Sequence, residues 1–155
     1  MSHEASFFPC ALGKGGVGFR KREGDGKTPA ETLRPLYVLY RADRILRPKS
    51  QLPIRAIGKD EGWCDDVNDR NYNRIVRLPY SASHEQLHRD DALYDIVVVL
   101  DYNIRPRIKG LGSAIFLHLA RPGFLPTEGC VAVHINVMHR LLERMTPRTK
   151  FRIEP

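Results

Sequence analysis

The fold is decided by the stretch IFLHLARPGFLPTEGCVAVHI, residues 115–135. At both of its ends, large aliphatic residues alternate with other residues, which is the two-residue period of a β-strand with one buried face. We therefore expect strands over residues 113–119 and 130–135, joined by a loop that contains Gly and Pro. The alternation puts the aliphatic side chains on the core faces and leaves His118, Cys130 and His134 on the opposite face.

An antiparallel pairing of these two strands would bring the thiol of Cys130 close to the imidazole of His118. Cross-strand neighbours lie about 5 Å apart at Cβ. A neighbouring imidazole can take the proton of a thiol and lower its pKa, which produces a nucleophile for acyl transfer. The pattern therefore predicts Cys130 as a nucleophile with a lowered pKa and His118 as its base. Gly129 allows a tight turn in which the amides of Gly129 and Cys130 face an oxyanion.

Other interpretations of these residues stay open. A cysteine in an apolar strand is usually structural, and a buried histidine is usually only hydrogen-bonded. His134 is a rival base, although it lies further along the strand of Cys130, displaced from the loop mouth. Thr127 is expected to order the turn or to contact a substrate.

The rest of the chain predicts a mostly β domain with one or two short helices. Strands are expected at residues 36–40, 54–57, 94–102 and 151–153, separated by turn residues, with a polar stretch at 59–74. Apolar residues at helical spacing predict a helix from Asn136, as its N-cap, to a stop at Pro147. A second short helix is expected at residues 85–93. The pattern indicates a β-sandwich or barrel-like sheet in a single domain, residues 1–155.

Composition limits the classes of partner. The 155 residues contain 25 Lys and Arg against 18 Asp and Glu, a formal charge of +7, which favours anionic polymers. The basic residues are scattered and no nucleic-acid motif accompanies them, so we expect no nucleic-acid partner. The longest apolar run, residues 96–100, is far shorter than the roughly 20 residues of a membrane span. Residues 1–9 lack the basic and apolar pattern of a signal peptide.

No cofactor or metal is expected. The three cysteines form no C-x-x-C pair, and the adjacent pairs His84-Glu85 and Asp65-Asp66 do not have the spacing of converging ligands. The glycine-rich residues 14–18 resemble part of a phosphate-binding loop. The Lys-Ser/Thr pair and the helix that such a loop needs do not follow them, so a turn is the better interpretation.

Residues 115–118 and 126–132 resemble the active-site signature of the L,D-transpeptidase catalytic domain, the YkuD family. That signature has a His, a loop, and then Ser/Thr-x-Gly-Cys followed by an aliphatic residue. Residues 24–29 are similar to the Thr-Pro segment of the family, and residues 63–74 resemble a short-form subgroup.

The resemblance implies a β-sandwich-like fold and a cysteine acyltransferase that acts on peptidoglycan stem peptides. Such an enzyme forms 3→3 cross-links or acts as an L,D-carboxypeptidase, in the cell envelope or periplasm. The resemblance makes Cys130 the nucleophile, His118 the base, and Gly129 part of the catalytic turn. Thr127, Phe116 and Tyr102 are the expected substrate contacts. The alternative is a non-catalytic module that binds the cell wall.

Two departures from the family pattern concern the substrate. The loop between His118 and Thr127 is shorter than in many members, which is expected to reshape the substrate groove. Ala132 stands where many members have Arg or Asn, so that contact is missing. The acyl acceptor and the oligomeric state are left open by the sequence.

Overall fold

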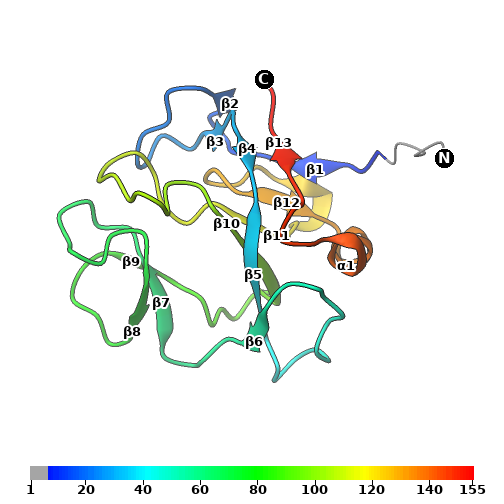
Figure 1. Ribbon diagram of the computed structural model, residues 1–155. Helices are drawn as coiled ribbons and strands as arrows, with labels where there is room; N and C mark the ends of the chain where they lie inside the picture. Colours follow the sequence, from blue (N-terminus) through cyan, green and yellow to red (C-terminus); the bar gives the residue numbers. More distant parts are fainter. Residues whose placement is uncertain (1–6) are drawn as a thin grey trace.

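A six-stranded mixed sheet is the centre of the computed structural model, which describes residues 7–155 (Figure 1). Most of the stretch considered for a signal peptide lies outside the described residues. From one edge to the other, the strands are β1 (Cys10–Ala11), β12 (Val131–Val133), β11 (Phe116–Leu119), β10 (Ile96–Leu100), β5 (Pro35–Tyr40) and β6 (Ile54–Ala56).

Strand β10 lies inside the sheet and supplies side chains to two separate cores. Its five residues are all buried, as the unbroken β-branched run predicts. Ile96, Val98 and Leu100 belong to the core that includes the helix α1 (Ile135–Arg144), through Met138 and Leu142. Val97 and Val99 face the opposite side of the sheet. The alternation along one strand thus divides the interior into two layers.

The second layer is closed by a small antiparallel sheet of β8 (Ile75–Arg77), β7 (Glu61–Cys64) and β9 (His84–Gln86). Trp63 of β7 packs edge-to-face on Phe116 of β11, with ring centroids 5.1 Å apart. The remaining elements are the pairs β2 (Val17–Gly18) with β3 (Thr28–Pro29) and β4 (Thr32–Leu33) with β13 (Phe151–Arg152), and the 3-10 turn η1 (Pro122–Phe124). The architecture is mostly β, layered, with one α-helix, which confirms the predicted fold class.

The predicted antiparallel hairpin is wrong, because β11 and β12 are parallel, with Leu117 opposite Val131 and His118 opposite Ala132. The connection between them, residues 120–130, passes beside the N-terminal loop at residues 12–14 before the chain enters β12. There the Thr127 amide donates to the Leu12 carbonyl (2.9 Å), and the Lys14 amide donates to the Thr127 carbonyl (2.8 Å). Side chains alternate in the same way in parallel and antiparallel strands, so His118 and Cys130 still share a face. That face is buried in the second core, however, and His134 lies beyond the end of β12 as the N-cap of α1.

Two helix predictions need correction. Residues 85–93 do not form a helix, because Glu85 pairs with Trp63 in the β7–β9 ladder. The N-cap of α1 is His134 and not Asn136: the Asn136 amide donates to His134 Nδ1 at 3.2 Å. The helix ends at Arg144, before the predicted stop at Pro147.

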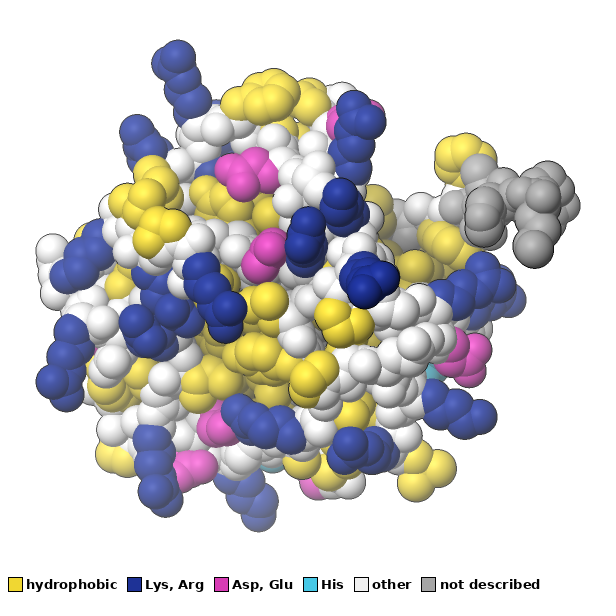
Figure 2. Space-filling view, viewed as in Figure 1, with side chains coloured by type: hydrophobic (Ala, Val, Ile, Leu, Met, Phe, Trp, Pro, Cys, Tyr) yellow, Lys and Arg dark blue, Asp and Glu magenta, His cyan; other side chains and the backbone are white. Residues whose placement is uncertain are grey.

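The surface carries its charge diffusely. Figure 2 shows Lys and Arg side chains spread across one face of the molecule, with acidic side chains between them. Within residues 7–155, no helix has the length and apolar character that crossing a membrane requires.

Candidate active site

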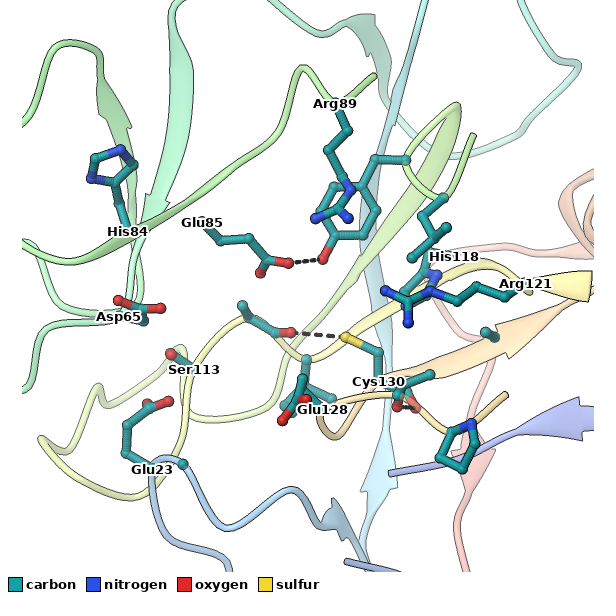
Figure 3. Close-up of a pocket in the computed structure, with 18 of the residues that line it drawn as sticks. Glu23, Asp65, His84, Glu85, Arg89, Ser113, His118, Arg121, Glu128 and Cys130 are labelled. Carbon is teal, nitrogen blue, oxygen red and sulfur yellow. Dashed lines mark hydrogen bonds between the residues drawn. The ribbon is translucent and has the colours of Figure 1, made fainter. Parts of the chain in front are cut away.

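A pocket of about 410 Å³ brings together segments that are far apart in the sequence. Cys130 and His118 both line it (Figure 3). Thr127 lines it as well. The central sheet contributes the thiol and the imidazole, the region of β9 contributes Glu85, and the loop before β3 contributes Lys21. The predicted nucleophile and base therefore share one cavity, although the strands run in the other relative direction.

Backbone groups hold the Cys130 thiol. Its side chain is buried, the thiol donates to the Ala114 carbonyl at 3.1 Å, and the Phe116 amide donates to Sγ at 3.4 Å. Ala114 has φ +53°, a left-handed conformation that is unusual for a residue with a side chain. Its amide donates to Asn73 Oδ1 (3.1 Å), which also accepts from Trp63 Nε1 (2.9 Å). Asn73 thereby supports the conformation that directs the Ala114 carbonyl at the sulfur.

The resting sulfur is a thiol, contrary to the predicted lowering of its pKa. Burial raises the pKa of Cys130 to about 12, and the Glu85 carboxylate contributes in the same direction. The Phe116 amide and the Lys21 ammonium oppose this increase. The prediction was wrong because a strand pattern reports neighbours along two strands, whereas the burial comes from distant segments that close over the sulfur.

His118 is held in one tautomer. Its Nδ1 lies 2.9 Å from the Leu119 carbonyl oxygen. A carbonyl only accepts, so Nδ1 carries the proton and Nε2 keeps the lone pair of a base. Burial, together with the positive charges of Arg89 and Arg121, lowers the pKa of His118 to about 4. The resting imidazole is therefore neutral.

The turn before Cys130 is ordered by Thr127. Gly129 has φ +139°, and a Cβ built there would lie 2.8 Å from the Lys27 carbonyl oxygen, so only glycine fits. The Gly129 amide donates to Thr127 Oγ1 (3.1 Å), and Thr127 Oγ1 donates to the Cys130 carbonyl (2.7 Å). The Gly129 amide is thus already engaged, which corrects its predicted availability as an oxyanion donor.

Three residues considered at the sequence level lie outside the pocket lining. Phe116 is fully buried and contacts the sulfur through its backbone amide. Tyr102 is buried, and its hydroxyl donates to the Leu111 carbonyl at 2.6 Å. His134 is exposed at the start of α1. The structure does not bring these three side chains to the cavity.

Sequence reasoning missed a polar group beside His118. The Tyr94 ring packs edge-to-face on the His118 imidazole at 5.3 Å, and its hydroxyl donates to the Glu85 carboxylate. Burial raises the pKa of Glu85. The Arg89 guanidinium lies 5.2 Å from the centroid of the Tyr94 ring. No local pattern marks this group, and residues 85–93 were expected to form a short helix.

The far end of the pocket is acidic. Glu23 and Asp65 line it together with Ser113, whereas Glu128, which is paired with Lys14, lies in the turn beside Cys130. Figure 3 shows Asp65, Ser113 and Glu23 on the side away from His118 and Arg121. Asp65 Oδ1 is buried and has no hydrogen-bond partner among the described residues. Within residues 7–155, no cluster of three or more His, Cys, Asp or Glu side chains can hold a metal ion.

Comparison with known proteins agrees with this arrangement. The family model YkuD, the L,D-transpeptidase catalytic domain, matches residues 2–153. No significant match is found among curated proteins or among solved structures. The match covers nearly the whole chain and includes both sides of the pocket. The chain therefore belongs to the YkuD family, the catalytic domain of the L,D-transpeptidases.

Proposed function

We propose that this protein is a cysteine acyltransferase that acts on peptidoglycan stem peptides, with Cys130 as the nucleophile and His118 as the base. One observation carries the proposal. The buried His118 donates Nδ1–H to Leu119, so its basic Nε2 is the free ring nitrogen in the pocket that it shares with the Cys130 thiol. A fixed base beside a thiol is the arrangement that activates sulfur for acyl transfer.

The reaction proceeds in two halves. In the first, Cys130 Sγ attacks the carbonyl carbon of the scissile amide, and its proton passes to His118 Nε2. The C–N bond then breaks, and the imidazolium returns the proton to the departing amine, which leaves a thioester on Cys130. In the second half, an amine or water attacks the thioester carbon. Its proton passes through His118 to the sulfur as the C–S bond breaks.

The proton moves during the attack and not before it. The pKa of Cys130 is about 12 and that of His118 about 4, so a thiolate–imidazolium pair is scarce in the free protein. General-base catalysis removes this barrier because the proton leaves as the S–C bond forms. The backbone amide of Cys130 stabilises the developing oxyanion, since the Gly129 amide is occupied by Thr127.

The acidic end of the pocket favours an amine acceptor and hence transpeptidation over hydrolysis. The carboxylates of Glu23 and Asp65 line this end. They accept hydrogen bonds from the amino group of a neighbouring stem peptide, including one at the unpartnered Asp65 Oδ1, and the neutral amine keeps the lone pair that attacks the thioester. Because peptidoglycan is the substrate, the protein acts in the cell envelope.

The test is intact-protein mass spectrometry after incubation with a carbapenem and, separately, with a tetrapeptide stem. We expect a covalent adduct on Cys130 that is absent in Cys130→Ala. Chromatography of the stem-peptide products then separates 3→3 cross-linked dimers from trimmed tripeptides. If the wild type forms no adduct but still sediments with purified sacculi, the non-catalytic wall-binding module is correct instead.

A further inference from the structure

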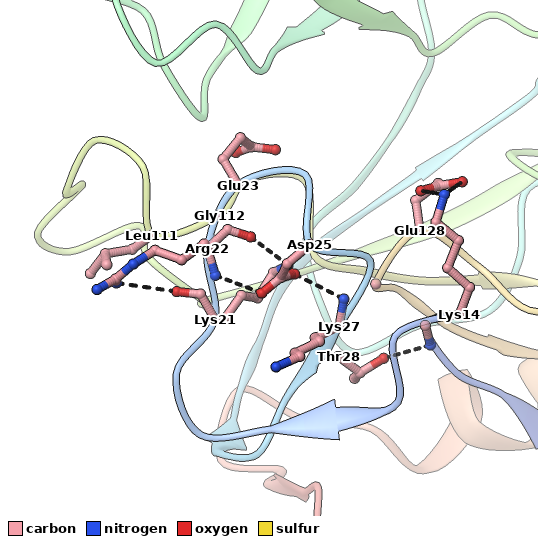
Figure 4. A network of polar contacts seen from close by, with 12 residues as sticks. Lys14, Lys21, Arg22, Glu23, Asp25, Lys27, Thr28, Leu111, Gly112 and Glu128 are labelled. Carbon is pink, nitrogen blue, oxygen red and sulfur yellow. Dashed lines mark hydrogen bonds and ion pairs between the residues drawn. The ribbon is translucent and has the colours of Figure 1, made fainter.

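A buried lysine lies behind the catalytic turn, and the reaction as described does not use it. The side chain of Lys21 is only 5% exposed. Its Nζ donates to Asp25 Oδ1 at 2.9 Å and to the Arg22 carbonyl at 3.4 Å (Figure 4). A charged ammonium is rarely buried unless it is paired, and Asp25 is its partner.

Asp25 is built to remain ionised. Its carboxylate accepts from Lys21 Nζ, from the Arg22 amide at 2.7 Å and from the Lys27 amide at 2.9 Å. Burial works against ionisation of this carboxyl, but the hydrogen bonds outweigh it and lower its pKa. The loop therefore holds a fixed ion pair at neutral pH.

The ammonium end of this pair is directed at the backbone of the catalytic turn. A Cβ built on Gly129 would lie 3.5 Å from Lys21 Nζ. A Cβ built on Gly112 would lie 2.7 Å from Lys21 Cε, so the absence of a side chain at Gly112 gives the lysine its path to the turn. Lys21 and Cys130 also line the same pocket.

We propose that Lys21 is a positioning residue for acyl transfer: its buried ammonium, fixed by Asp25 against the Gly129 backbone, stabilises negative charge at Cys130 and on the substrate oxygen. The inference rests on the proposed role of Cys130 as the nucleophile. It concerns which group compensates the charge that forms there.

The charges around the sulfur make such a group necessary. Glu85 faces the sulfur from β9 and disfavours an anion there, and Lys21 favours one. The other ionisable groups that line the cavity near Cys130 are His118 of β11, Arg121 after β11, Tyr94 before β10 and Glu128 of the turn. His118 is neutral at rest, and Arg89 is paired with Asp91. Arg121 lies beside His118, and the exposed Lys14 is paired with Glu128, so Lys21 is the buried cation that lies against the turn carrying the nucleophile.

Opposite substitutions in the ion pair test this role. Lys21→Met removes the positive charge and leaves Asp25, whereas Asp25→Asn removes the negative charge and leaves Lys21. At a pH below the pKa of a thiol, the alkylation rate is proportional to the thiolate fraction. A tenfold change in rate at fixed pH therefore corresponds to a change of one unit in the pKa of the thiol. We measure alkylation of Cys130 by iodoacetamide between pH 7 and 10 with peptide mapping. We expect Lys21→Met to slow it about tenfold and Asp25→Asn to accelerate it several-fold.

Controls separate charge from folding. Lys59→Met makes the same change of charge on an exposed lysine outside the pocket and should leave the rate unchanged. The double variant Lys21→Met/Asp25→Asn leaves no unpaired buried charge, so it is the comparison if a single variant does not fold. We expect it to alkylate more slowly than the wild type.

A change in the same direction for both single variants, or an unchanged rate in the folded double variant, would overturn the proposal. Failure of the proposed function looks different. In that case the carbapenem forms no adduct on Cys130 in the wild type, whatever the alkylation rates of the variants.

Discussion

At the scale of single residues, the two candidate bases have different surroundings. His118 is buried, fixed by the Leu119 carbonyl and in the pocket with Cys130, whereas His134 is exposed and caps α1. We expect His118→Ala to slow single-turnover acylation on the order of 10²-fold or more, the scale of a lost general base. His134→Ala should change the rate only a few-fold and cost about 1 kcal/mol of stability as a lost N-cap. A large loss of acylation rate in His134→Ala, with His118→Ala little affected, would show that His134 is the base and not His118.

The nucleophile is tested by comparing the cysteines. Cys130→Ala should abolish acyl transfer and keep the native circular dichroism spectrum, with a stability change of about 1 kcal/mol for the lost sulfur. Cys10 is exposed and outside this pocket, so Cys10→Ala should retain full activity. Acyl transfer that survives in a folded Cys130→Ala protein would place the nucleophile elsewhere.

The roles proposed for Cys130 and His118 could be predicted from sequence because a short motif around two strands contains them. Their protonation states could not. Tyr94, which packs on the imidazole, and the charges of Glu85 and Arg89, which shift the two pKa values, come from another part of the chain. These residues lie more than twenty positions before His118 and reach it only through the packing of β9 and β10. Desolvation depends on such tertiary contacts, which a local pattern does not contain.

At the scale of elements, strand alternation predicted which side chains share a face but not the direction of the strands. The period of two is the same in parallel and antiparallel sheets, so the direction depends on the connection. Here the connection is fastened to the N-terminal loop through Leu12, Lys14 and Thr127. That contact spans more than a hundred residues. The β7–β9 sheet was missed for a related reason, since its strands are short and polar at their ends.

Thr127 joins this connection to the catalytic turn and gives an element-scale prediction. Thr127→Val keeps the shape but loses the bonds to the Gly129 amide and the Cys130 carbonyl. Leaving these groups unpaired should cost about 1–3 kcal/mol of stability. The acylation rate should fall by roughly tenfold or more, because the sulfur is no longer held in position. Thr127→Ser retains the hydroxyl and should keep both properties. Urea unfolding and single-turnover acylation measure them, and equal acylation rates in the two variants would contradict this role.

At the scale of the whole molecule, folding buries both Cys130 and His118, and this makes the stability of the protein depend on pH. A buried group whose pKa differs between the folded and unfolded chain makes stability depend on pH. For Cys130 the folded pKa is raised from 9.0 to about 12, so its contribution is lost as the pH rises above 9.0. For His118 the folded pKa is lowered, which places its effect in the acidic range.

The acidic limb can be isolated with one variant. The pKa of His118 falls from 6.5 to about 4 on folding, so between these values the unfolded chain binds the proton and the folded chain does not. Stability is therefore complete above pH 6.5 and decreases towards pH 4, by up to about 3 kcal/mol. His118→Gln cannot titrate, so its urea unfolding free energy should decrease less over the same range. Carboxylates that titrate in both proteins cancel in this comparison. Parallel pH profiles for the two proteins would mean that the pKa of His118 does not change on folding. The imidazole would then be charged in the folded protein at mildly acidic pH, and the neutral base that the mechanism needs would be lost there.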